Sequence, residues 1–83
     1  MIDRSHLPGA KSTVENFIDV LERSPVDRAA DREWPTLMGR MMMVAEEFAL
    51  PKAAFLQHVT NGEVPEAVTE CRAWLSRLER LGS

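Results

Sequence analysis

The chain lacks most of the features that mark disulfide-rich, secreted and membrane proteins. It has a single cysteine, Cys71, in 83 residues, so an internal disulfide framework is excluded. Its longest uninterrupted apolar run, Met41–Ala45, is far shorter than the roughly 18–20 residues that cross a bilayer. No apolar stretch follows the first charged residues, as a secretory signal would require. Together these absences predict a cytoplasmic protein without a membrane span.

Catalytic and metal-binding groups are also scarce. The chain has two histidines and no tyrosine, and it contains neither a glycine-rich phosphate loop nor a GxSxG elbow. His58 has no Asp, Glu, Cys or His three or four residues away, and His6 lies in a stretch without helical periodicity, so no metal site is expected. Glu46 and Glu47 are adjacent and would point about 100° apart on a helix, which prevents them from acting as a paired acid and base. We therefore expect a non-catalytic protein that holds no metal or cofactor.

The composition is that of one small globular domain. Hydrophobic residues make up 45% of the sequence and charged residues 28%. A chain of this length buries only about 60–65% of its unfolded surface, so its stability is expected to be modest unless it associates. Its 13 acidic and 10 basic residues give a net charge of −3, opposite in sign to what neutralising nucleic-acid phosphates requires. A nucleic-acid role would therefore have to rest on a local patch.

Prolines and capping residues divide the sequence into short helical segments. Residues 1–11 contain Pro8–Gly9 and show no periodicity, which predicts a flexible leader before a single helical domain at residues 12–83. Ser12–Glu15 matches a capping box and predicts a first helix that runs to about Ser24. Four prolines predict further helix starts, giving helices over residues 25–33, 35–50, 51–62 and 65–81. With no alternating strand pattern, the predicted fold class is all-α: a compact bundle of four to five short helices.

Apolar residues recur at helical spacing in the first and last of these segments. The first helix is expected to bury one face, made of Val14, Phe17, Ile18 and Leu21. The last helix carries a longer apolar arc, made of Ala67, Val68, Cys71, Trp74, Leu75, Leu78 and Leu81. Gly62 is predicted to end the segment before it in a left-handed conformation.

The central segment, residues 35–50, has apolar residues on two sides. One side carries Leu37, Met41, Val44 and Phe48, which form an ordinary core face. The far side carries a second strip of Gly39, Met43 and Leu50 next to Glu46 and Glu47. Two interpretations follow: a central helix packed on both sides, or a helix whose second strip meets a partner. The second interpretation assigns partner binding to Gly39, Met43, Glu46, Glu47 and Leu50.

Residues 44–65 also resemble the helix-turn-helix of the phage-repressor-like family. The small Ala45 and the hydrophobic Val44, Phe48, Leu50 and Phe55 match the positions that hold the two helices of that motif together. The sequence departs from the pattern with Ala49 where the turn usually has glycine, and with His58 at a late hydrophobic position. The resemblance implies a major-groove surface. Its residues would be Lys52, Ala53, Gln57, His58 and Asn61.

Two functional hypotheses result. The first is a small, non-catalytic regulatory or inhibitory protein, of the size and charge found among phage- or mobile-element-encoded inhibitors, that binds a protein partner or itself through a helical surface. An adaptable thioether beside acidic groups would suit a basic partner groove. The alternative is a dimeric helix-turn-helix DNA-binding regulator. Between Val44 and Glu63 there is one basic residue against three acidic ones, so the charge favours the first hypothesis.

Overall fold

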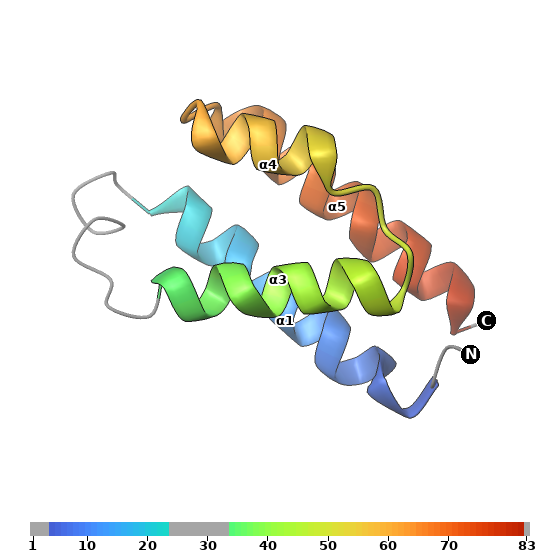
Figure 1. Ribbon diagram of the computed structural model, residues 1–83. Helices are drawn as coiled ribbons and strands as arrows, with labels where there is room; N and C mark the ends of the chain where they lie inside the picture. Colours follow the sequence, from blue (N-terminus) through green and yellow to red (C-terminus); the bar gives the residue numbers. More distant parts are fainter. Residues whose placement is uncertain (1–3, 24–33, 83) are drawn as a thin grey trace.

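The computed structural model describes residues 4–23 and 34–82, and these ranges are built of helices without a strand (Figure 1). This confirms the predicted all-α fold class. The predicted short helix at residues 25–33 lies outside the described residues. The elements are a short 3-10 helix η1 (Arg4–His6) and the α-helices α1 (Leu7–Glu22), α3 (Trp34–Glu47), α4 (Ala53–Thr60) and α5 (Val64–Leu81).

The helices form two pairs that are joined through α1 and α5. These two helices run antiparallel and make the most extensive contact, so that Leu7 at the start of α1 lies next to Gly82 at the end of α5 (Figure 1). Helix α3 lies mainly against α1, and α4 folds back mainly against α5. One side of α3 is therefore packed against α1.

Helix α1 begins earlier than the sequence pattern predicted. Leu7 and Ala10 are buried, and they extend the apolar face that continues through Val14. Pro8 occupies the first turn, where its missing N–H has no intrahelical partner to lose. The predicted start at Ser12 is therefore wrong, and residues 7–11 belong to the helical domain rather than to a flexible leader.

A row of aromatic rings crosses the core and links α1, α3, α4 and α5. Phe17 of α1 stacks on Trp34 of α3 with ring centroids 5.2 Å apart, and it meets Phe55 of α4 edge-on at 5.4 Å. Phe55 in turn lies 4.8 Å from Trp74 of α5. The indole Nε1 of Trp74 donates a hydrogen bond to the carbonyl of Pro51 at 3.0 Å, which fixes the α3–α4 connection to α5. Aromatic pairs of this kind add about 0.5–1.5 kcal/mol each beyond their buried area.

Helices α3 and α4 end in the same left-handed turn but with different residues. In α4 the turn residue is Gly62 (φ 73°), and the N–H of Glu63 reaches back to the carbonyl of His58 at 2.8 Å. This confirms the predicted glycine stop. In α3 the turn residue is Ala49 (φ 53°), and the N–H of Leu50 reaches the carbonyl of Ala45 at 2.8 Å. The predicted helix through Leu50 is therefore too long, because α3 ends at Glu47.

Candidate protein-binding surface

Met43 stands out because its side chain faces solvent. It is 71% exposed, and no other large hydrophobic side chain within the described residues is classed as exposed. Met41, two residues earlier on the same helix, is fully buried against α1 and the aromatic row. The two methionines therefore mark opposite sides of α3. The exposure of Met43 does not fit a central helix packed on both sides, whereas the interpretation that the second strip meets a partner stays a prediction.

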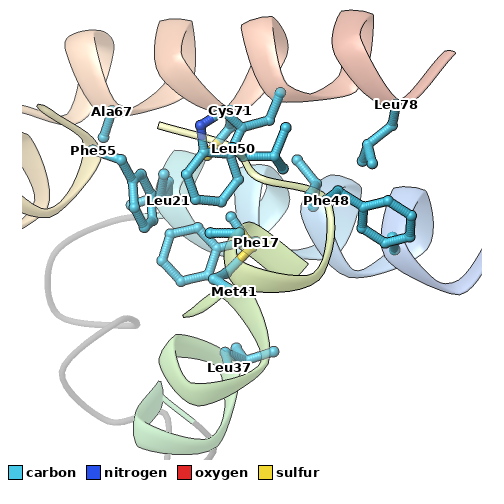
Figure 2. Close-up of a cluster of buried hydrophobic side chains, with 14 of the residues drawn as sticks. Phe17, Leu21, Leu37, Met41, Phe48, Leu50, Phe55, Ala67, Cys71 and Leu78 are labelled. Atoms are coloured by element: carbon cyan, nitrogen blue, oxygen red, sulfur yellow. The ribbon is translucent and has the colours of Figure 1, made fainter. Parts of the chain in front are cut away.

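Four of the five predicted partner-binding residues lie on the surface, and the fifth is buried. Gly39, Glu46 and Glu47 are exposed like Met43. Leu50 is only 6% exposed, and Figure 2 shows it among the buried side chains of the core. Its assignment to the partner strip is wrong, because the left-handed turn at Ala49 breaks the helical projection and directs the next side chain inward. We call the remaining set, Gly39, Met43, Glu46 and Glu47, the α3 surface.

An open groove of about 250 Å³ runs along one edge of the α3 surface, between α3 and the first turns of α1. The space is open because the residues of α1 that face it are small, and Met43 lies beside it. The groove is lined by His6, Gly9, Ala10, Thr13, Arg40, Met43, Val44, Glu47 and Phe48. The sequence pattern did not point to His6, Gly9 and Ala10, because residues 1–11 were expected to form a flexible leader. The signal that could have found them is the spacing of Leu7 and Ala10 relative to Val14.

Charged groups surround the groove and the α3 surface. His6 Nδ1 lies 2.8 Å from Glu47 Oε1, and Lys52 Nζ donates to Glu46 Oε1 at 3.1 Å. These pairs are solvent-exposed, so each contributes no more than about 1 kcal/mol and leaves the carboxylates able to accept further partners. Arg40 is exposed and has no ion-pair partner within residues 4–23 and 34–82. The surface therefore offers both signs of charge.

Two glycines on this side of the molecule sit inside helices without a packing reason. A Cβ added to Gly39 in α3, or to Gly9 in α1, would meet no atom within 4 Å. Glycine in a helix interior costs about 0.5–1 kcal/mol relative to alanine. The fold of the single chain does not explain that cost at Gly39, whereas close approach by another molecule would.

The residues that the helix-turn-helix resemblance assigns to DNA lie at the α4 side. Lys52, Ala53, Gln57 and Asn61 are exposed, and His58 is partly buried. Three of the five are bound to carboxylates: Lys52 to Glu46, and His58 and Asn61 to Glu63 at 3.1 and 3.4 Å. The hydrogen bond from His58, followed by that from Asn61, lowers the pKa of Glu63, so this carboxylate stays charged next to the groups that would face phosphates.

The residues on which the helix-turn-helix resemblance rests match that motif only in part. Ala45, Phe48, Leu50 and Phe55 are buried, and Ala49 has the left-handed conformation that explains the usual glycine. However, α3 lies mainly against α1 and α4 mainly against α5, rather than the two helices packing chiefly on each other. The resemblance remains a prediction.

Reactive chemistry is limited across the described parts of the chain. Cys71 is fully buried on α5, and desolvation by that burial, followed by the charge of Glu70, raises the pKa of its thiol from 9.0 to about 12. No three His, Cys, Asp or Glu side chains of the described residues gather closely enough to hold a metal ion. Within the same ranges, no helix combines the length and the apolar character of a membrane span.

Comparisons with protein-family models, with curated proteins and with solved structures give no match for this chain.

Proposed function

We propose that this chain is a small, non-catalytic regulatory protein that acts by binding a protein molecule through the α3 surface and the adjoining groove. The observation that carries the proposal is the 71% exposure of Met43 on a helix whose opposite side is fully used by the core. Burying one Met side chain contributes roughly 1.5–3 kcal/mol, which is a strong single contact for an exposed residue.

The surroundings of Met43 have the composition of a binding surface. A Met side chain is unbranched and polarisable, so it adapts to an irregular partner surface. The groove beside it is formed in part by Gly9 and Ala10, which leave room for an apolar side chain of the partner. Glu46, Glu47 and Arg40 supply a charged rim around this centre. An apolar centre with a polar rim is the usual arrangement of protein interfaces.

A photo-crosslinking amino acid at position 43 tests the proposal directly. The matched control carries the same group at Ser76, which is exposed on a different helix, α5. In its native host, the position 43 variant should give a discrete crosslinked protein band that the position 76 variant lacks. A band at neither position, or equal bands at both, would rule out the α3 surface as a specific binding site.

A charge substitution gives an independent test. Met43→Glu should leave the thermal midpoint within about 4 °C of the unmodified chain, because surface substitutions change stability by about 0.5 kcal/mol or less. It should also abolish the crosslinked or associated species. If Met43→Glu instead unfolds the chain, Met43 is part of the core and the proposal fails.

The second candidate is a DNA-binding regulator, which the left-handed Ala49 turn and the buried Ala45 and Leu50 favour. Non-specific DNA affinity comes from phosphate contacts and needs no operator. A mobility shift at low salt with random duplex DNA should therefore appear at micromolar protein if this candidate holds. We expect no shift, because Lys52, His58 and Asn61 at this site are bound to carboxylates.

A further inference from the structure

We propose that the partner of the α3 surface is a second copy of this chain, with the two α3 helices packed antiparallel about a two-fold axis next to Met43. The inference rests on the proposed function and names its partner. Three features of α3 carry it: the order of the charges along the helix, the position of Gly39, and the apolar residue at the centre.

The charge order makes α3 self-complementary only in the antiparallel direction. Arg40 lies about one turn before Met43, and Glu47 lies about one turn after it. Residues seven apart differ by only about 20° around a helix, so these two charges flank the same side of Met43. A two-fold axis near Met43 places Arg40 beside Glu47 of the second copy, and the symmetry forms that pair twice. Parallel packing would set like charges against each other.

The other side of Met43 carries a matching pair of different character. Gly39 and Glu46 are also seven residues apart, so the same axis sets Gly39 opposite Glu46 of the second copy. Because Gly39 has no Cβ and nothing lies within 4 Å of where one would stand, the second helix can approach its backbone closely. The aliphatic stem of Glu46 would cover that backbone while its carboxylate stays in solvent.

Existing contacts of the acidic residues do not prevent this arrangement. Glu47 and Glu46 are paired with His6 and Lys52 in exposed positions, and a carboxylate has enough lone pairs to accept an arginine as well. Arg40 has no ion-pair partner within the described residues. In the dimer, Arg40 and Glu47 would therefore pair with each other, and neither charge would be buried without a partner.

A contact made by one helix from each copy is small, so the dimer should be weak and concentration-dependent. Sedimentation equilibrium from micromolar to millimolar protein should show a reversible monomer–dimer equilibrium that weakens at high salt. Arg40→Glu alone and Glu47→Arg alone should each weaken it about fivefold to tenfold, since two like-charge contacts replace two attractive ones.

Mixing the two variants is the decisive measurement. In a heterodimer of Arg40→Glu with Glu47→Arg, both cross-pairs are attractive again, one with the original charges and one with reversed charges, so the mixture should associate more strongly than either variant alone. The double variant in one chain should recover the homodimer. Circular dichroism checks that each variant keeps its helix content. Variants that lose the dimer without rescue on mixing would overturn the antiparallel arrangement.

Gly39→Ala adds a second, independent readout. It should raise the stability of the monomer, because alanine favours the helix, and it should weaken the dimer, because a methyl group now separates the two backbones. A dimer unaffected by this change would contradict the close approach at Gly39.

The outcomes separate this inference from the proposed function. A chain that stays monomeric up to millimolar concentration, but crosslinks through position 43 to a different protein, overturns the second copy as partner and supports the proposed function. A crosslink at twice the mass of the chain supports both. No crosslink at position 43, together with a monomer at all concentrations, overturns both.

Discussion

Helices α5 and α3 differ in how fully the fold uses their sequences. The four deepest apolar residues of α5 are completely buried, and the α4 turn before it uses glycine for its left-handed conformation. In contrast, α3 exposes Met43, carries Gly39 in its interior and ends on a left-handed Ala49. Each of these three features is unfavourable or unused in the single chain. Local conflicts of this kind concentrate at functional sites, which is why we place the binding surface on α3.

The largest expected effect contrasts the two methionines on opposite sides of α3. Met41→Ala should lower the free energy of unfolding by about 2–5 kcal/mol, because it opens a cavity in the packed core. Met43→Ala, the same substitution two residues later, should change it by no more than about 0.5 kcal/mol. Urea unfolding of both variants measures the difference. Equal losses of unfolding free energy would show that α3 is buried on both sides. The contrast between α3 and α5 would then be wrong.

The buried thiol of α5 should make stability fall at high pH. Because burial raises the pKa of Cys71 from 9.0 to about 12, the folded chain holds the thiol neutral while the unfolded chain loses its proton. The contribution is fully present below about pH 9 and is lost as the pH rises from 9 towards 12. Urea midpoints at pH 8 and pH 10.5 should differ more for the natural chain than for Cys71→Ala. An identical difference in both would mean that the thiol is accessible when the chain is folded.

A smaller effect compares the two left-handed turns. Ala49→Gly should stabilise the chain by about 1 kcal/mol, because an L-residue other than glycine is strained at positive φ. Gly62→Ala should cost a similar amount for the same reason. The urea midpoint should therefore rise for the first variant and fall for the second. A loss of stability in Ala49→Gly would mean that the turn at Ala49 is not left-handed in solution.

Sequence periodicity was enough to predict the fold class and α5. The spacing of Ala67, Cys71, Trp74 and Leu78 marks one face of a helix, and Gly62 is a residue type that favours the conformation it adopts. Both signals are local, so they do not depend on what the rest of the chain does.

The parts that the sequence pattern missed depend on non-local packing. Pro8–Gly9 is compatible with a turn or with the first turn of a helix, and only the burial of Leu7 and Ala10 decides between them. Helical projection gives no sign of a left-handed turn at an alanine, so it placed Leu50 on the outer strip, whereas the helix-turn-helix resemblance implied a turn at Ala49 and a packed Leu50. The groove exists only because α1 and α3 come together. Of the predicted site, the exposed Gly39, Met43, Glu46 and Glu47 follow from helical projection alone.

The proposed interface requires that Met43 faces solvent in the monomer and becomes covered on association. Selective ¹³C-methyl labelling of methionine, followed by two-dimensional NMR over a concentration series, measures both. For dilute protein, the Met43 methyl should give a sharp signal at the position of an unstructured methionine, while the buried Met41 methyl should be shifted by nearby aromatic rings. On concentration the Met43 signal should move and that of Met41 should not. A Met43 signal that is already ring-shifted in dilute solution and insensitive to concentration would contradict the account.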